Sequence, residues 1–260
     1  MSSLLDKIVA EKKIEVKNLK QQGLSTEERS DDLAISDFKK AISSHNQVSL
    51  IAEIKYASPS QGTIRQPLDP ISIAYVYYSV GAVAISLLTD QKFFSGDLKN
   101  LSALKRNFPI PILRKDFIID EIQVRESYIN GADAILLIAG ILSRQQLQDL
   151  LEITKSLGMA AITEVHNEDE MQRAIDCKAD IIGINNRNLD TFNVDLQTTH
   201  TLAALAPEDC ILISESGIDK DADIYALKKS RINAMLVGTS IMKSNNIAKK
   251  VIELIDAGRH

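Results

Sequence analysis

This sequence has few cysteines, no excess of basic over acidic residues and no long apolar runs, and each of these lacks counts against a class of protein. The two cysteines, Cys177 and Cys210, have no metal-ligand or redox spacing, which predicts free thiols in a reducing compartment. The formal net charge of −5 argues against a large nucleic-acid-binding surface. The longest apolar runs, near 80–88 and 134–142, are about half as long as a transmembrane span. The N-terminus is charged by Asp6 and lacks the apolar region of a signal peptide. We therefore expect a cytoplasmic protein without membrane or nucleic-acid partners.

Motifs for common cofactors are also missing. No Gly-x-Gly-x-x-Gly follows the first predicted strand, which counts against a dinucleotide-binding fold. No carboxylate and histidine spacing predicts a metal site. His166 is the one histidine near a predicted strand end, and without an obvious acidic partner in the sequence we interpret it as structural.

The sequence is rich in short apolar runs of strand length, separated by segments with helical spacing such as 69–79 and 145–157. Their predicted carboxyl ends are 21 to 34 residues apart, the size of a βα unit. There are eight such runs: Leu50–Ile54, Ala82–Leu88, Ile110–Leu113, Ala132–Ile138, Met159–Thr163, Ile181–Ile184, Ile211–Ile213 and Ala234–Val237.

Glycines punctuate these units at Gly81, Gly131 and Gly158, each between a predicted helix and the next strand. Eight βα units within roughly 210 residues fit a closed (β/α)₈ barrel better than an open, doubly wound sheet. The prediction is therefore an α/β protein with one domain, residues 1–260, built as a single (β/α)₈ barrel.

The first 46 residues form a predicted helical extension that precedes the barrel. Residues 3–20 have apolar positions at helical spacing among lysine and glutamate, which predicts an amphipathic helix. Residues 21–32 are polar and predicted to be a loop, and residues 35–42 a second short helix with Ser36 as its N-cap. A last helix is expected at 247–257.

Charged and polar residues stand at the carboxyl ends of the predicted strands, where barrels of this kind carry their active sites. Glu53 and Lys55 share one face of the first strand because side chains alternate along it. One charged residue at a strand end is commonly a solvated rim residue, but a structural barrel interior prefers Val, Ile and Leu. Several charges on separate strands therefore favour catalysis. The set comprises Glu53, Lys55, Lys115, Glu164, Asn185, Asn186, Arg187, Glu215 and Ser216.

Two further features predict a ligand. Ser216-Gly217 and Gly238-Thr239-Ser240 follow strands seven and eight, where such barrels often bind phosphate, although both could be ordinary turns. Phe93, Phe94, Phe117 and Phe192 each lie just past a strand end; alone each would be core, but together they could form an apolar wall for an aromatic ring. The loop 58–65, which contains Gly62, is predicted to be a mobile lid.

Six segments in this order resemble the indole-3-glycerol-phosphate synthase family of tryptophan biosynthesis. They are Ile51-Ala-Glu-Ile-Lys-Tyr-Ala-Ser-Pro-Ser60, Arg114-Lys-Asp-Phe-Ile-Ile-Asp120, Thr163-Glu-Val-His166, Ile182-Gly-Ile-Asn-Asn-Arg-Asn-Leu189, Ser214-Glu-Ser-Gly-Ile218 and Val237-Gly-Thr-Ser240. The resemblance implies a (β/α)₈ barrel with a helical N-terminal extension. It also implies ring closure of 1-(2-carboxyphenylamino)-1-deoxyribulose 5-phosphate with loss of carbon dioxide and water, by a carbon–carbon lyase that uses neither metal nor organic cofactor.

The resemblance implies a role for each matching residue. Lys115 is expected to be the general acid that protonates the substrate ketone, and Glu164 with Lys55 to remove the hydroxyl and then the proton. Glu53 is expected to hold and tune the lysines, and Asn185 and Glu215 to bind and position the substrate.

The remaining matches are binding residues. The expected substrate contacts are Ser58, Arg187 and Ser216, with the anthranilate ring packed on Pro59, Phe94, Phe117, Leu136 and Phe192. The expected phosphate ligands are Lys55, Gly217, Gly238 and Ser240.

Three positions depart from the family pattern: Tyr56 stands where a basic residue is common, Arg114 where a small one is, and Thr239 where glutamate is frequent. None replaces a proposed catalytic group. Two other functions stay open: a Schiff-base aldolase, since a barrel lysine can be a nucleophile, and a non-catalytic sugar-phosphate-binding barrel. The expected partner is a small phosphorylated substrate. Other enzymes of the tryptophan pathway are candidate partners, and a monomer is favoured.

Overall fold

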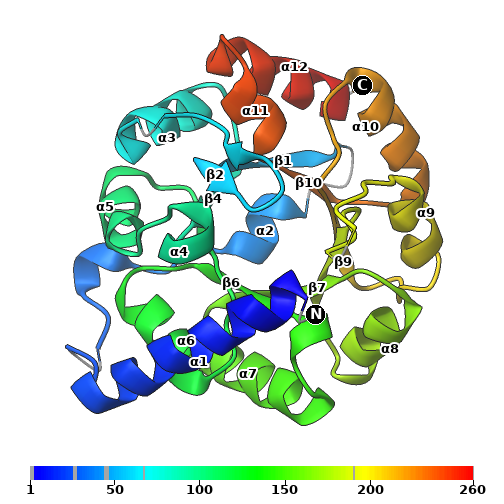
Figure 1. Ribbon diagram of the computed structural model, residues 1–260. Coiled ribbons are helices and arrows are strands. Elements are labelled where there is room, and N and C mark those ends of the chain that lie inside the picture. Colours follow the sequence, from blue (N-terminus) through cyan, green and yellow to red (C-terminus); the bar gives the residue numbers. More distant parts are fainter. Residues whose placement is uncertain (1–2, 26–27, 44–46, 67, 190, 260) are drawn as a thin grey trace.

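The computed structural model describes residues 3–25, 28–43, 47–66, 68–189 and 191–259. Eight parallel strands form a closed barrel, in which β1 pairs with β4 on one side and with β10 on the other. A closed parallel barrel surrounded by helices confirms the predicted fold class (Figure 1). The barrel strands are β1 (Ser49–Ile54), β4 (Ala84–Leu88), β5 (Ile112–Lys115), β6 (Ala134–Ile138), β7 (Ala160–Val165), β8 (Ile181–Asn185), β9 (Ile211–Glu215) and β10 (Ala234–Val237).

Helices follow the strands and form the outer ring seen in Figure 1. The longer ones are α3 (Pro70–Ser79), α5 (Lys99–Asn107), α6 (Glu121–Ile129), α7 (Arg144–Ser156), α8 (Glu168–Asp176), α9 (Gln197–Ala203), α10 (Asp221–Leu227) and α12 (Ile247–Arg259). Shorter elements lie in the loops after strands: the hairpin of β2 (Ala57–Ser58) and β3 (Gly62–Thr63), α4 (Gln91–Phe94) and α11 (Thr239–Lys243). No helix in the described ranges is long and apolar enough to cross a membrane.

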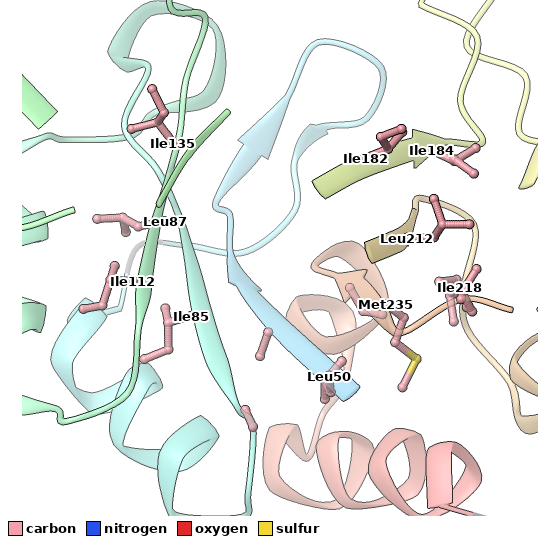
Figure 2. Close-up of a cluster of buried hydrophobic side chains, with 14 of the residues drawn as sticks. Leu50, Ile85, Leu87, Ile112, Ile135, Ile182, Ile184, Leu212, Ile218 and Met235 are labelled. Atoms are coloured by element: carbon pink, nitrogen blue, oxygen red, sulfur yellow. The ribbon is translucent and has the colours of Figure 1, made fainter. Parts of the chain in front are cut away.

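The period-two alternation of the strands divides the core into two layers. On β1, Leu50, Ala52 and Ile54 pack in the layer between strands and helices, whereas Ile51 packs inside the barrel. Figure 2 shows part of the outer layer, with aliphatic side chains such as Ile85 projecting from the strands. Because the strands are parallel and in register, their inward-facing carboxyl-terminal residues meet at one mouth.

The N-terminal extension contacts the barrel at both ends. Helix α1 (Leu4–Gln22) begins with a capping box, in which Ser3 and Asp6 each accept a hydrogen bond from the other's backbone N–H. In Figure 1 it lies across the front of the barrel, with its first turn toward the middle of the ring. Helix α2 (Phe38–Ile42) packs Phe38 and Ile42 against inward-facing strand residues and closes the opposite end.

The predicted N-cap of the second helix is wrong. The helix begins at Phe38, and its cap is Asp37, whose carboxylate accepts a hydrogen bond from Lys40 N–H at 2.8 Å. Ser36 is used elsewhere, because its backbone N–H donates to Asp133 Oδ1 at 2.7 Å and so fixes the chain to the start of β6. Residues 44–46, at the end of the predicted extension, lie outside the described residues.

Candidate active site

One cavity opens at the carboxyl-terminal mouth of the barrel, and all of the predicted site residues line it except Phe93 and Asn186. Asn186 is buried beside the cavity, where its Nδ2 donates to Ser214 Oγ and to the backbone oxygen of Glu215. The structure therefore brings together groups from strands far apart in sequence, although their roles remain predictions. The lining includes Glu53, Lys55, Ser58, Pro59, Phe94, Lys115, Phe117, Leu136, Glu164, Asn185, Arg187, Phe192, Glu215, Ser216, Gly217, Gly238 and Ser240.

An ion pair at the end of β1 forms one wall. Glu53 and Lys55 follow Ile51 on the inward face, and Lys55 Nζ lies 2.8 Å from Glu53 Oε2. Glu53 is buried, and Lys55 is partly open to the cavity. The pairing satisfies two charges that would otherwise be costly inside the barrel.

A second, larger cluster surrounds Lys115 at the end of β5. Its Nζ lies 2.8 Å from Glu164 Oε2 on β7 and 3.2 Å from Glu215 Oε2 on β9. Asn185 Nδ2 donates to the other oxygen of Glu164 at 3.2 Å. The two glutamates are each 2% exposed, so this charge cluster lies within the barrel rather than on its rim.

The three charged groups of this cluster have different pKa values and therefore different protonation states at neutral pH. Burial alone lowers the pKa of Lys115, but the carboxylates of Glu164, Glu215 and Glu53 outweigh it and raise the pKa above that of a free lysine. Burial raises the pKa of Glu164, yet Lys115 and His166 bring it below the usual range. Burial raises the pKa of Glu215 to about 7, with Lys115 opposing the rise and Glu164 adding to it. At neutral pH the site thus holds a protonated lysine, an ionised glutamate and a glutamate close to half-protonated.

Two glycines leave room for two of these carboxylates. A Cβ added to Gly238 would lie 2.1 Å from Glu53 Oε2, and one added to Gly183 would lie 2.4 Å from Glu215 Oε1. Both approaches are far shorter than a van der Waals contact. Gly183 therefore positions a site residue without bearing any functional group, and the sequence reading missed it.

Apolar side chains form another part of the cavity wall. The rings of Phe94 and Phe117, which follow the neighbouring strands β4 and β5, lie 5.8 Å apart between centroids, and Phe192 lines the cavity from the loop after β8. Phe93, which the sequence placed in this wall, lies outside the cavity lining; Lys92 Nζ lies over its ring. Leu4, Leu5 and Ile8 of α1 complete the wall, and the sequence did not place them there. Their helical spacing identified an apolar face but could not indicate what it contacts.

The loops after β9 and β10 supply backbone groups at the third side. Ser216 and Gly217 both have positive φ, 66° and 82°, so the chain turns sharply at the mouth. Ser240 lies in the first turn of α11, where its hydroxyl donates to Asp219. This is the side on which the sequence predicted phosphate.

The interpretation of His166 as a residue without an acidic partner is wrong. Its Nδ1 lies 2.9 Å from Glu170 Oε2, and its Nε2 lies 3.2 Å from Glu164 Oε1. Glu164 and His166 are two residues apart near a strand end, so they share a face, which was the available signal. Glu170 comes from α8, whose docking the sequence could not specify.

Two of the departures from the family pattern, Tyr56 and Arg114, lie outside the cavity lining. Tyr56 is buried and its hydroxyl donates to Leu68 O at 2.6 Å. Arg114 lies between β5 and α6, where its guanidinium pairs with Glu126 at 2.9 Å and with Asp116 at 3.2 Å. Thr239 alone of the three lines the cavity. Within the described residues, no group of three or more His, Cys, Asp or Glu is arranged to hold a metal ion.

Comparison with known proteins gives a consistent result. The family model "Indole-3-glycerol phosphate synthase" matches residues 5–254. The chain is 42% identical over 257 residues to an indole-3-glycerol phosphate synthase of Desulfotalea psychrophila, covering 98% of this chain and 99% of that one. It is 45% identical over 258 residues to the enzyme of that name from Endomicrobium trichonymphae, covering 97% of this chain and all of the relative.

Solved structures share the fold at low identity. The 3-hexulose-6-phosphate synthase of Salmonella typhimurium superposes with a TM-score of 0.67 at 12% identity, covering 82% of this chain and 100% of that chain. That likeness shows the barrel only. The family match across nearly the whole length, together with two relatives above 40% identity, is specific: the chain belongs to the indole-3-glycerol phosphate synthase family.

Proposed function

We propose that this protein is an indole-3-glycerol-phosphate synthase, a carboxy-lyase of tryptophan biosynthesis. It closes the indole ring of 1-(2-carboxyphenylamino)-1-deoxyribulose 5-phosphate and releases carbon dioxide and water. A phosphorylated small-molecule substrate fits the family. The observation that carries the proposal is the Lys115 ammonium, held 2.8 Å from Glu164 and 3.2 Å from Glu215 at the edge of a cavity with an apolar wall.

In the first step the ring carbon that bears the carboxylate attacks the ketone carbon, and Lys115 donates a proton to the ketone oxygen. Carbon dioxide then leaves, and its bonding electrons restore the aromatic ring. A lysine kept protonated by carboxylates suits this role as an acid, and it disfavours the neutral amine that Schiff-base chemistry needs. The ammonium also stabilises negative charge developing on oxygen.

In the second step the new hydroxyl leaves as water and the adjacent carbon loses a proton, which forms the double bond of the indole. Glu164 and Lys55 perform these transfers, and Glu53 holds Lys55 in place through the 2.8 Å pair. Asn185 and Glu215 position the substrate. Buried Glu215 Oε1 has no hydrogen-bond partner among the described residues, and it can accept one from a substrate hydroxyl.

Binding is divided between the other two sides of the cavity. Pro59, Phe94, Phe117, Leu136 and Phe192 pack the anthranilate ring. Ser58, Arg187 and Ser216 contact polar groups of the substrate, and Lys55, Gly217, Gly238 and Ser240 hold the phosphate. We further propose that residues 1–260 act as one domain and as a monomer in the cytoplasm, with other enzymes of the pathway as candidate partners.

The direct test is to add the anthranilate-derived ribulose phosphate to the purified protein, without added metal, and to follow indole fluorescence. Turnover to indole-3-glycerol phosphate is expected. The analogue whose ketone is reduced to an alcohol should bind and inhibit without reacting, because it offers no carbonyl for ring closure. Tight binding of the substrate itself without turnover would instead show a binding protein.

A further inference from the structure

His166 follows β7 and lies between two carboxylates from different elements. Its Nε2 is 3.2 Å from Glu164 Oε1, and its Nδ1 is 2.9 Å from Glu170 Oε2. The histidine side chain is 11% exposed, so solvent compensates little of its charge. The ring therefore bridges the reacting cluster to helix α8.

The arrangement fixes the protonation of the ring. An ionised carboxylate only accepts hydrogen bonds, so both ring nitrogens must carry protons to face two carboxylates favourably. Burial alone lowers the pKa of His166, but Glu164 and Glu170 outweigh it and raise the pKa to about 10. The other charged side chains lining the same hollow are Arg187 and Asp195.

Glu170 is itself firmly held, which gives the ring a rigid support. Its Oε2 also accepts the backbone N–H of His166 at 2.9 Å, and its Oε1 accepts from Asn167 Nδ2 at 2.9 Å. Asn167 caps α8 by accepting the backbone N–H of Glu170 at 2.9 Å. A ring fixed at Nδ1 in this way keeps its Nε2 within ion-pair distance of Glu164 Oε1, at 3.2 Å, although the N–H is not aligned for a hydrogen bond.

We propose that His166 is a positioning residue for the ring closure, holding Glu164 Oε1 while Lys115 holds Oε2. This inference rests on the proposed function. When Lys115 gives its proton to the ketone oxygen, it becomes neutral and Glu164 loses one cation. The imidazolium remains, so Glu164 stays ionised and oriented for the dehydration that follows.

The test compares His166→Ala and His166→Gln with the unmodified enzyme in steady-state kinetics from pH 5 to 9. His166→Ala should lower kcat about tenfold or more, the effect of losing one charged partner of Glu164, with KM within about twofold. Removal of this cation raises the pKa of Glu164, but Lys115 still holds that carboxyl ionised throughout this pH range. The loss of kcat should therefore be the same at every pH measured.

His166→Gln can donate to Glu164 without a charge, so it should recover much of the kcat that His166→Ala loses. His200→Ala, which removes a histidine from α9, is the matched control and should leave kcat and KM unchanged. Thermal unfolding of each variant reports on folding separately from kinetics.

Three outcomes would overturn the proposal while the function stands: an unmodified kcat in His166→Ala, a rise in KM alone, or a loss of rate that only follows a loss of folded protein. If the unmodified protein shows no turnover, the proposed function itself fails, whatever the variants do.

Discussion

Two buried lysines, Lys12 and Lys115, each lie among carboxylates. Lys12 attaches a helix to the barrel, whereas Lys115 faces the cavity. Lys12, on α1, is 2% exposed and lies 2.8 Å from Asp116, 2.9 Å from Asp90 and 2.8 Å from Glu15. Lys115 lies one residue before Asp116 in the chain and faces Glu164 and Glu215 in the cavity. Of the first cluster only Asp116 borders the cavity, whereas Lys115, Glu164 and Glu215 of the second all line it.

The two clusters differ in the pKa values of their carboxyl groups. Burial raises the pKa of Asp116, but Arg114 and Lys12 outweigh it and bring the pKa to about 2, so Asp116 is fully ionised and its charge is satisfied. Glu215 instead has its pKa raised to about 7, so it is close to half-protonated at neutral pH. A buried cluster that keeps its carboxylate ionised suits attachment, and one that leaves a group poised near neutrality is suited to chemistry.

Removing Lys12 should produce the largest effect. Lys12→Met removes the cation that buried Asp90 and Asp116 share and leaves Asp116 with Arg114 alone, and breaking such a cluster costs about 3–5 kcal/mol. Chemical denaturation should show this loss in the free energy of unfolding. The control is Lys13→Met on the exposed side of the same helix, which should change it by less than about 0.5 kcal/mol. Equal effects of the two substitutions would mean that the buried cluster does not anchor α1.

Removing Lys115 should affect rate rather than stability. Lys115→Ala should lower kcat by roughly 10²-fold or more, the usual scale for a positioned acid, with little change in KM. The variant should fold, because the aliphatic layers of the barrel are untouched. Steady-state kinetics of Lys115→Ala, compared with those of the exposed control Lys99→Ala, test this prediction. Near-normal kcat in the Lys115 variant would refute the proposed acid.

Lys55 should show a mixed effect. It pairs with Glu53 and lies on the proposed phosphate side, so Lys55→Ala should both raise KM several-fold and lower kcat by about tenfold. The ratio of the two changes distinguishes Lys55 from Lys115. If Lys55→Ala changed kcat alone, Lys55 would not contribute to phosphate binding.

The pKa of Glu215 is raised and that of Asp116 is lowered, which predicts that the two groups change the stability of the protein with pH in opposite directions. Glu215 has a folded pKa of about 7, above the unfolded value near 4.3, so its folded form binds the extra proton and stability falls as pH rises between the two. Glu215→Gln has no carboxyl group to ionise there, so it does not lose stability in this way. The free energy of unfolding of the variant minus that of the unmodified protein should therefore rise by about 2 kcal/mol from pH 5 to pH 8.

Asp116→Asn should behave in the reverse sense. The folded pKa of Asp116, about 2, is below its unfolded value, so its contribution is present above about pH 4 and is lost as pH falls through 2. Chemical denaturation of Glu215→Gln and Asp116→Asn at a series of pH values measures how the free energy of unfolding of each variant depends on pH. The same pH dependence in both variants would show that the clusters do not differ.

The smallest expected effect concerns the predicted lid. The hairpin of β2 and β3 lies at the mouth, and Arg65 at its base donates to the backbone oxygen of Met242 at 2.6 Å. Product should slow hydrogen exchange in 58–64, because ligand beneath the hairpin favours its closed form. The turn at 207–210 leads into a strand at the opposite end of the barrel and should exchange equally with and without product.

The barrel and most of its mouth were predictable because each βα unit carries its own pattern. Strand register then aligns residues such as Lys115 and Glu164, whose separation along the chain is irrelevant once the strands are parallel. The missed residues depend on docking instead. Lys12 had the sequence signature of an ordinary surface lysine, and only the position of α1 on the barrel buries it. Likewise, Glu170 reaches His166 only once α8 has packed beside β7.

The space beside Gly183 and Gly238 constrains how this barrel could evolve or be engineered. A larger residue at 183 requires both Glu215 and Ile162 to give way, and one at 238 requires Glu53 to do so. A substitution at either glycine alone therefore passes through a clashing intermediate. A library that varies each glycine together with the side chains facing it samples combinations that single-site variation does not reach.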